Sequence, residues 1–322
     1  MEPEITGMKT SIFPTNILLA TDGSSEAELA ARTVIDLAQR TGSKLHVVHV
    51  FYWAHASLLD PISSDLEVHE AVQKKAQARL QEAVGRIEED FGGTVESSRL
   101  RVGRPDAEIV TQAEEIGAGL IVMGSRGLGA FGRSLMGGVS EAVVRHAHCP
   151  VLVVRGEPVV LPTTKVLLAT DGSKSVTHAT QAAVELAKKT DSELHVLYVG
   201  EDAHSAPLFY PEATNPGGVE QADPALVEEL GRQFEQRARQ VLDAEVEKVR
   251  VLGGTVAEVH SRMGKPAAEV VDLAEELDAG LVVVGSRGLG GIRRALIGSV
   301  SDSVVRHAHC PVLVVRKEDH NK

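Results

Sequence analysis

The chain lacks the features that mark secreted, membrane-spanning and nucleic-acid-binding proteins. It has only two cysteines, Cys149 and Cys310, so a disulfide framework is excluded. Its apolar runs are all far shorter than the roughly 20 residues that a bilayer-spanning helix needs. No run of lysine or arginine forms a basic arm, and the net charge is −12, so nucleic acid is not an expected partner. With no charged-then-apolar leader at the N-terminus, the sequence predicts a cytoplasmic protein.

Several catalytic signatures are missing as well. The sequence has no GxxxxGK[ST] loop, and therefore no P-loop lysine for γ-phosphate transfer. It has no GxSxG nucleophile elbow and no paired-carboxylate signature, so a hydrolytic site has no local support. The sequence therefore favours binding over catalysis.

What the chain does contain is a long internal repeat. Segments 118–155 and 279–316 align without a gap and are identical at 28 of 38 positions, ending in the shared stretch VVRHAHCPVLVVR. A length of 322 residues fits two domains of roughly 150 residues each, which we place at 1–156 and 164–322. The linker, GEPVVLPTT, is short and contains proline, so the halves should pack as a pseudo-dimer within the chain. The VLVVR strand of each half is the candidate for pairing across that interface, and a homodimer is an alternative.

Each half alternates short apolar runs with longer amphipathic segments, which predicts strands alternating with helices. Near-continuous apolar strands of this kind indicate a parallel sheet that is buried on both faces. We therefore expect an α/β protein made of two tandem, doubly wound domains, each with a five-stranded parallel sheet. The expected strands are 16–21, 44–51, 94–102, 120–124 and 150–155 in the first half, and 165–170, 193–199, 255–263, 281–285 and 311–316 in the second.

Local signals predict where several helices begin. Ser24 or Ser25 stands at an N-cap position before an amphipathic segment, with acidic residues in its first turn. Pro105 and Pro266 each follow a glycine and a basic residue and suit the first turn of a helix.

A glycine-rich loop follows the fourth strand of each half and leads into a helix pattern. A strand-to-helix loop of this kind offers free backbone N–H groups and the positive end of a helix, which together suit phosphate. Ser140, Ser299 and Ser301 add hydroxyl donors at the same place. The loop residues that we expect at the site are Gly124, Arg126, Gly127, Gly137, Gly138, Val139 and Ser140 in the first half, and Gly285, Arg287, Gly288, Gly298, Ser299, Val300 and Ser301 in the second.

An aspartate follows the first strand of each half, in the sequence TDGS. Asp22 and Asp171 stand where an acidic side chain can accept hydrogen bonds from a ribose or a base edge. The alternative is that the glycines only make turns and that the two aspartates cap the helices after them. Recurrence of the same spacing in both halves favours the binding site.

These motifs resemble those of the universal stress protein family. The glycine loops fit its G-2x-G-9x-G(S/T) signature, and the flanking TDGS and HCPVLVV stretches extend the resemblance over almost the whole chain. The resemblance implies a tandem two-domain member with a Rossmann-like fold of the adenine nucleotide alpha hydrolase type. It further implies that the glycine signature holds the phosphates and ribose of ATP, taken up with Mg²⁺. Asp22 and Asp171 would lie by the adenosine, and Val50 and Val199 would contact adenine.

The family resemblance implies a nucleotide-responsive regulator of stress adaptation or growth, acting through a regulatory protein partner. Two alternatives stay open. The first is a slow ATPase or phosphotransferase, and the second is an interaction scaffold that needs no nucleotide.

The two loops differ at one position of the signature, where the first half has Gly138 and the second has Ser299. A hydrogen bond to a charged acceptor is worth about 1.5–3 kcal/mol. We therefore expect the first site to bind ATP more weakly than the second.

Three further groups of residues allow a functional interpretation that we do not favour. His146, His148 and Cys149, like their equivalents in the second half, are too crowded for a structural zinc site. His46, His49 and His195 lie in strand patterns and are expected to be core or rim histidines, so no metal site is predicted. Aromatic residues after the second strand of each half, including Trp53 and Phe209, either cover the sheet or form lids.

Overall fold

A computed structural model describes residues 12–52, 66–127, 136–156, 165–173, 176–201, 224–287 and 297–316. Trp53 and Phe209, named above as possible lid residues, lie outside these ranges, as do most of the linker and Gly288.

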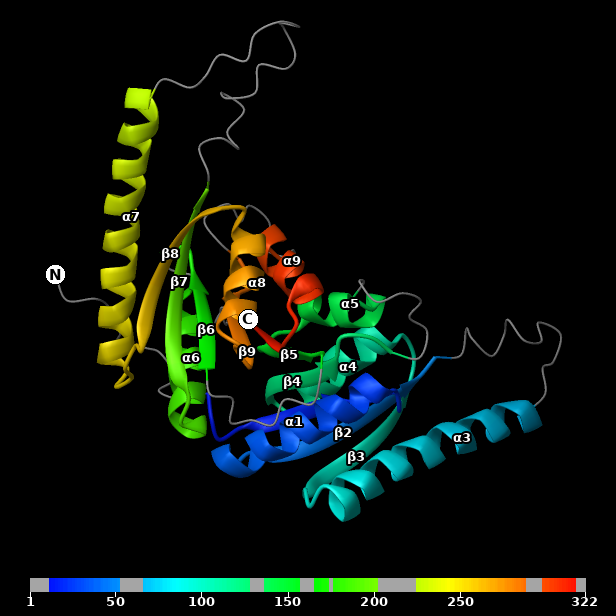
Figure 1. Ribbon diagram of the computed structural model, residues 1–322. Helices are drawn as coiled ribbons and strands as arrows, with labels where there is room; N and C mark the ends of the chain where they lie inside the picture. The colour runs from blue at the N-terminus through cyan, green and yellow to red at the C-terminus, as the bar shows by residue number, and fades with distance from the viewer. Residues whose placement is uncertain are drawn as a thin grey trace, which may run out of the picture.

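Ten strands form one continuous sheet through both halves of the chain (Figure 1). They are β1 (Asn16–Ala20), β2 (Lys44–Phe51), β3 (Val95–Val102), β4 (Ala118–Gly124), β5 (Val151–Val154), β6 (Lys165–Thr170), β7 (Glu193–Glu201), β8 (Glu258–Gly264), β9 (Leu281–Gly285) and β10 (Val312–Val315). Their order across the sheet is β3-β2-β1-β4-β5-β10-β9-β6-β7-β8, so each half repeats the same arrangement. Every neighbouring pair is parallel except β5 and β10. The expected α/β fold with two five-stranded, doubly wound parallel sheets is confirmed.

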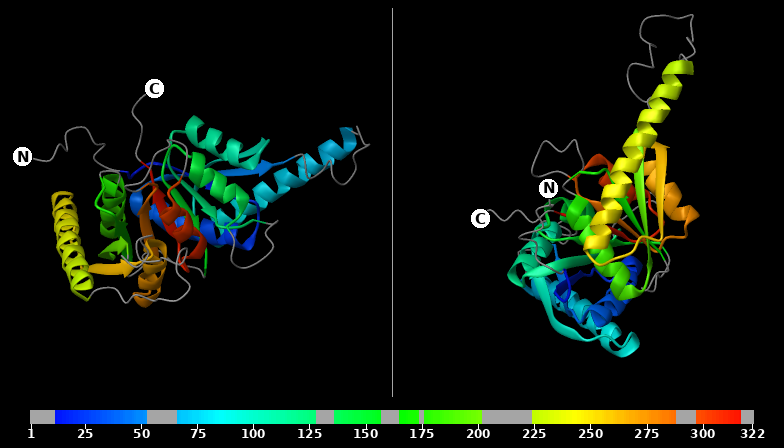
Figure 2. Two further views of the ribbon diagram at one scale, coloured as in Figure 1. Left: turned by 90° about the horizontal axis from the view of Figure 1, so that it is seen from above. Right: turned by 90° about the vertical axis from the view of Figure 1, so that its left-hand side faces the viewer.

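Helices cover both faces of the sheet. The described helices are α1 (Ser25–Thr41), α3 (Leu66–Gly85), η1 (Arg86–Asp90, a π-helical turn), α4 (Pro105–Glu115), α5 (Gly138–His146), α6 (Thr177–Thr190), α7 (Pro224–Val251), α8 (Pro266–Glu276) and α9 (Ser299–His307). Core residues of α1, α3, α6 and α7 pack on one face, and those of α4, α5, α8 and α9 pack on the other. The long helices α3 and α7 lie at opposite ends of the molecule (Figures 1 and 2).

The inner strands, unlike the edge strands β3 and β8, are apolar on both faces because both faces are covered. In β1, Ile17 and Leu19 belong to one core while Leu18 and Ala20 belong to the other, and all four are buried. This two-sided burial is the reason that the sequence shows continuous apolar runs rather than alternation.

The helix starts follow the local signals in the sequence. Ser24 is the N-cap of α1, and its Oγ accepts a hydrogen bond from the N–H of Ala27 at 3.2 Å. Pro105 and Pro266 occupy the first turns of α4 and α8. The N–H groups of the first helical turn have no partner within the helix. Proline has no N–H, so it occupies this position without losing a hydrogen bond.

The two halves join edge to edge through β5 and β10. These strands pair antiparallel, with Leu152 opposite Leu313 and Val153 opposite Val312, as expected for the VLVVR segments. The arginine that ends each strand crosses to the other half. Arg155 Nη1 donates to the carbonyl of Val305 at 2.8 Å, and Arg316 Nη1 donates to the carbonyl of Ala147 at 3.0 Å. Each arginine thus caps the C-terminal end of a helix in the opposite half, where a cation is favourable.

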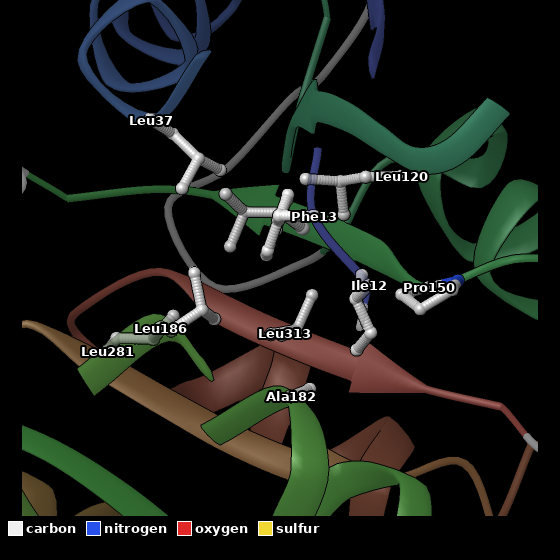
Figure 3. A pocket seen from close by; sticks show the side chains of 10 residues that line it. Ile12, Phe13, Leu37, Leu120, Pro150, Ala182, Leu186, Leu281 and Leu313 are labelled. Atoms are coloured by element: carbon white, nitrogen blue, oxygen red, sulfur yellow. The ribbon is translucent and has the colours of Figure 1, made fainter. Parts of the chain in front are cut away.

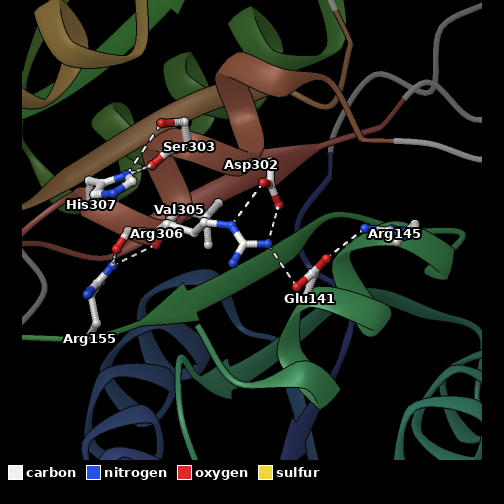
Figure 4. A network of polar contacts seen from close by, with 8 residues as sticks. All are labelled: Glu141, Arg145, Arg155, Asp302, Ser303, Val305, Arg306 and His307. Carbon is white, nitrogen blue, oxygen red and sulfur yellow. Dashed lines mark hydrogen bonds and ion pairs between the residues drawn. The ribbon is translucent and has the colours of Figure 1, made fainter. Parts of the chain in front are cut away.

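A direct ion pair adds to this reciprocal junction (Figure 4). Arg306 of α9 lies 2.8 Å from a carboxylate oxygen of Glu141 in α5, and it also bonds Asp302 within its own helix. Glu141 in turn accepts from Arg145 at 2.7 Å. The network therefore links α5 directly to α9.

Apolar side chains from both halves meet beside this junction (Figure 3). They enclose a cavity of about 10 Å³ with an apolar lining that includes Phe13, Leu37, Leu186 and Leu313. A space this small and apolar does not hold an ordered water, so it is a packing contact between the halves and not a ligand site.

Both cysteines are free and buried, as expected for packing residues. Burial raises the pKa of the Cys310 thiol to about 12, which keeps it protonated and unreactive. Among the helices that the structure describes, none is long and apolar enough to cross a membrane.

Candidate functional site

The candidate site lies where the strand order reverses in each half. In the first half β1 pairs with β4, Leu19 lying opposite Val122, and the chains that leave these two strands run in opposite directions across the sheet. In the second half β6 pairs with β9 in the same way. A reversal of this kind opens a crevice at the carboxyl ends of the strands, which is where doubly wound folds bind ligands. Both the TDGS segment and the glycine loop lie at this point.

Asp22 and Gly127 lie against each other across the crevice. A Cβ atom at Gly127 would lie only 2.3 Å from Asp22 Oδ2, so a larger residue cannot occupy this position without displacing the carboxylate. Gly127 is exposed and its φ angle is not in the left-handed region, so the Asp22 carboxylate is the constraint on a side chain at this position. The two predicted site residues are brought together.

The aspartates also form local turns. Asp22 Oδ1 accepts the N–H of Ser24 at 3.0 Å, and Asp171 Oδ1 accepts the N–H of Ser173 at 2.9 Å. These contacts are the short-range turns of the alternative interpretation. The turn contacts are made by Oδ1 of each carboxylate, and they are compatible with a role at the crevice.

The first turn of α5 is open to solvent. Its N-cap is Gly137, and no described side chain caps the helix there. The following residues, Gly138 and Val139, are exposed. Because the first N–H groups of a helix have no intrahelical partner, they point outward as donors at the positive end of the helix. The first turn of α9 has the same form, with Gly298 as N-cap and Ser299 and Val300 exposed.

Both loops close in the same way on the strand that precedes them. The N–H of Gly137 donates to the carbonyl of Ser125 at 2.8 Å, and the N–H of Gly298 donates to the carbonyl of Ser286 at 2.8 Å. The same pair of positions is therefore bonded in both halves. This contact places the helix start beside the start of the loop.

Ser140 and Ser301 differ from the expectation that they donate to phosphate. Both are buried, and their hydroxyls donate to the carbonyls of Gly124 at 2.9 Å and Gly285 at 2.6 Å. A hydroxyl has one proton, which is engaged here in holding the helix on the strand. In the described first turns of α5 and α9, the donors left for a phosphate are the exposed backbone N–H groups and the hydroxyl of Ser299.

Gly138 has room for a side chain. A Cβ atom at this position would meet nothing within 4 Å, so the glycine is not required by packing. Ser299 occupies the equivalent exposed position in the second half. At this position the two halves therefore differ in a hydroxyl donor, and packing among the described residues does not impose the difference.

Glu26 is a loop-binding residue that the sequence motifs did not indicate. Its carboxylate accepts from Ser125 Oγ at 2.6 Å, from the N–H of Arg126 at 2.7 Å and from Arg126 Nε at 2.7 Å. A Cβ at Gly124 would lie 2.9 Å from Glu26 atoms, so that glycine admits the first turn of α1. The contact joins residues 100 positions apart. Comparing the two halves could have drawn attention to Glu26, because the halves differ there: Ser175 stands at the equivalent position. Ser175 lies outside the described residues.

The remaining predicted residues have less defined roles. Val50 and Val199 lie near the carboxyl ends of β2 and β7 and pack partly buried against the core under α4, α5, α8 and α9. Arg287 is half-buried at the start of the second loop, and Gly288 lies outside the described residues. A hollow of about 150 Å³ opens beside Asp22, between α1 and α3, so there is space next to this aspartate.

The crowded histidines and cysteines do not converge on a common point. His146 Nδ1 lies 2.8 Å from the carbonyl of Ala142, and His148 Nε2 lies 3.2 Å from the carbonyl of Ala118. Each ring is thus engaged with a different backbone carbonyl. His49 is likewise held by the carbonyl of Thr21, at 2.7 Å.

Comparison with known proteins agrees with this architecture. The profile of the Universal stress protein family matches residues 14–155 and again residues 162–316. Universal stress protein Rv2623 of Mycobacterium tuberculosis is 30% identical over 314 residues, which cover 94% of this chain and 96% of the relative. Universal stress protein YxiE of Bacillus subtilis is 33% identical over 152 residues, 47% of this chain and 98% of the relative.

A solved structure shares the tandem arrangement. The universal stress protein from Archaeoglobus fulgidus DSM 4304 is 26% identical and superposes with a TM-score of 0.66, covering 97% of this chain and 100% of that one. The fold and the paired glycine loops define a tandem, doubly wound α/β protein with a candidate anion site at each strand-order reversal. The chain belongs to the universal stress protein family.

Proposed function

We propose that the protein binds ATP with Mg²⁺ in both halves and acts as a nucleotide-responsive regulator in the cytoplasm, in stress adaptation or growth control. Occupancy would be read by a regulatory protein partner or by a change of assembly. The family and the glycine signature support a nucleotide ligand, and the chemistry of the site supports a phosphate group.

The observation that carries the proposal is the open helix start beside the Asp22–Gly127 contact. The exposed first turn of α5 presents backbone donors and the positive end of a helix, which attract phosphate. Asp22 lies against the loop at Gly127, where a carboxylate can accept from ribose hydroxyls. Because Gly127 has no side chain, the loop and the Asp22 carboxylate can lie this close together.

Two differences support unequal affinity of the sites. Ser299 supplies a hydroxyl that Gly138 lacks. In addition, the carboxylate of Glu26 neutralises Arg126 and brings negative charge to the start of the first loop. The second half has Ser175 at this position, so its loop does not carry that charge. Both differences favour tighter binding in the second half.

The junction between the halves provides a physical route from one site to the other. Helices α5 and α9 would each receive phosphate at the N-terminal end. At the C-terminal end each is capped by an arginine of the opposite half, and the Arg306–Glu141 pair joins them. A shift of either helix on binding would therefore change its contacts with the other half.

The proposal is tested by the nucleotide content of gently purified protein. We expect adenine nucleotide to co-purify, to be released on denaturation, and to be identified by mass spectrometry at up to two molecules per chain. Protein that carries no adenine nucleotide and shows no change in melting temperature with added Mg–ATP would overturn the proposal. It would favour a nucleotide-independent scaffold instead.

A further inference from the structure

A second cluster of polar side chains lies at the opposite end of the strands from the glycine loops. His195, near the start of β7, faces His260 of β8, and His195 Nδ1 lies 3.1 Å from His260 Nε2. Glu258 is two residues before His260 on the same strand, and its Oε2 lies 3.8 Å from His260 Nε2. One ligand atom from each of the three residues lies within 4.8 Å of the others.

We propose that His195, His260 and Glu258 form a binding site for a divalent transition metal ion, with Zn²⁺ as the best fit. Zinc binds imidazole nitrogen at about 2.0–2.1 Å and carboxylate oxygen at about 2.0–2.2 Å, so two of its ligands lie roughly 3.3 Å apart. The observed separation of the two nitrogens matches this spacing closely. The carboxylate of Glu258, which is mostly exposed, needs only a rotamer adjustment to complete the set.

The burial of His195 supports a role beyond packing. The side chain is 5% exposed, yet its Nε2 atom has no hydrogen-bond partner among the described residues. A carboxylate oxygen of Glu193 lies 3.6 Å from this atom. If Nδ1 bound a metal, Nε2–H would face Glu193, which is the carboxylate–histidine–metal arrangement that fixes the tautomer and orientation of ligating histidines. The buried and unsatisfied nitrogen then has a function.

The charge of the cluster suits a cation. Glu193 and Glu258 place two carboxylates beside two imidazoles. Imidazole and carboxylate together are ligands that zinc accepts, and three protein ligands leave a fourth position for water or an outside group.

The cluster is present in one half only. In the first half the position of His195 is held by His46, but Ser97 and Arg99 stand in place of Glu258 and His260. His46 Nδ1 is satisfied there by Ser97 Oγ at 2.8 Å. The first half therefore has a hydrogen-bonded histidine, while the second half has two possible ligands beside the equivalent histidine.

A metal at this place would join the two outermost strands of the second half. β8 is an edge strand that pairs only with β7 among the described strands, and the ion would bridge them near their amino ends. The site is thus separate from the glycine loops at the carboxyl ends of the strands. Its occupancy does not depend on nucleotide binding.

The test uses the full chain without a polyhistidine tag, stripped of metal with a chelator. Titration with Zn²⁺ by calorimetry and with Co²⁺ by visible absorption should reveal an ion bound per chain with the d–d bands of a low-symmetry site. His260→Arg, which introduces the residue of the first half, should lower the Zn²⁺ affinity by about 100-fold or more. Glu193→Gln should lower it about tenfold, as loss of an orienting partner does.

The first half offers a matched control. His46→Gln removes the equivalent histidine and should leave metal uptake unchanged. Conversely, Ser97→Glu combined with Arg99→His should build a second site around His46 and add one ion per chain. Circular dichroism melts confirm that each variant is folded. Wild-type protein that binds no Zn²⁺, or a folded His260→Arg protein that binds it as the wild type does, would overturn the proposal.

Discussion

The carboxylate of Glu26 accepts a hydrogen bond from the backbone N–H of Arg126 at 2.7 Å. The first turn of α1 thus binds the start of the glycine loop through a negatively charged side chain. The same carboxylate binds the guanidinium of Arg126 and the hydroxyl of Ser125. The second half has no acidic residue at the equivalent position, because Ser175 stands there. The two halves therefore differ in the charge that an incoming phosphate meets.

Replacing Glu26 with serine is expected to strengthen ATP binding in the first half. Two charges about 4 Å apart interact by about 1 kcal/mol in water and about 4 kcal/mol near a protein surface. For this partly exposed carboxylate we expect a gain of about 1–2 kcal/mol, or roughly 5–30-fold in Kd. Titration calorimetry of Glu26→Ser with a two-site fit measures the change.

The reciprocal variant, Ser175→Glu, should weaken the second site by a similar factor. Glu28→Ser is the matched control, since Glu28 lies in the same helical turn but pairs with Arg32 and Arg86 instead of the loop. Weaker binding in Glu26→Ser would contradict the electrostatic account and indicate that Glu26 preorganises the loop for its ligand.

The exchange of Gly138 and Ser299 tests the contribution of one hydroxyl. Gly138→Ser should tighten the first site and Ser299→Gly should loosen the second, each by about 1.5–3 kcal/mol. The substitution at Gly138 is sterically free because a Cβ there meets no atom within 4 Å. Unchanged affinity in both variants would show that this position does not contact the phosphates.

Gly127→Ala should damage the first site while leaving the fold intact. The added methyl would lie 2.3 Å from Asp22 Oδ2, so either the loop or the aspartate must move. The carboxylate can move aside at little cost to the fold, but its hydrogen bond to the ligand would be lost. A hydrogen bond is worth about 0.5–1.5 kcal/mol, so we expect roughly 2–13-fold weaker ATP binding in the first half.

Gly138→Ala is the control for that substitution, because the second half already has a Cβ at the equivalent position and the space is open. Its affinity for ATP should stay within about twofold of the wild type. Equal losses in Gly127→Ala and Gly138→Ala would argue that any side chain on the loop blocks the ligand, and not that the Asp22 contact matters.

The metal-free protein should lose stability as the pH falls below about 6.5. Burial is the largest cause that lowers the pKa of folded His260; His195 and Arg262 lower it further, while Glu258 and Glu276 oppose the shift. The unfolded chain, with histidine near 6.5, then binds protons more readily than the folded chain. The contribution of His260 is therefore fully present above pH 6.5 and is lost as the pH falls toward the folded pKa.

Urea unfolding at about pH 7.5 and about pH 5.5 measures this loss. The loss of unfolding free energy between the two pH values should be smaller in His260→Arg than in the wild type. It should not be abolished, because burial also lowers the pKa of His46. A pH dependence that is identical in the two proteins would contradict the assignment to His260.

The strands and the binding loop could be predicted because their signals are local. Apolar runs such as that of β1 reflect burial on both faces, and the glycines of the loop stand at fixed spacing after β4. The VLVVR pairing was also predictable, since the linker that follows it is short. Whether the predicted residues bind ATP stays a prediction.

The contacts made by Glu26 and by His260 could not be read from periodicity. Glu26 reaches a loop 100 residues away because the first turn of α1 packs on Gly124. His260 meets His195 through the register of β7 and β8, which a one-residue shift would destroy. Ser140 and Ser301 were expected to donate hydrogen bonds to the phosphates. In the structure their hydroxyls donate to the carbonyls of Gly124 and Gly285 instead, which the sequence did not indicate.

The central claim, two ATP sites of unequal strength, is tested most directly by calorimetric titration of nucleotide-free full chain with Mg–ATP. The account predicts two molecules bound per chain in two resolved steps, with Ser299→Gly weakening the tighter step and Glu26→Ser strengthening the weaker one. Absence of binding, or a single class of equal sites that neither variant separates, would contradict it.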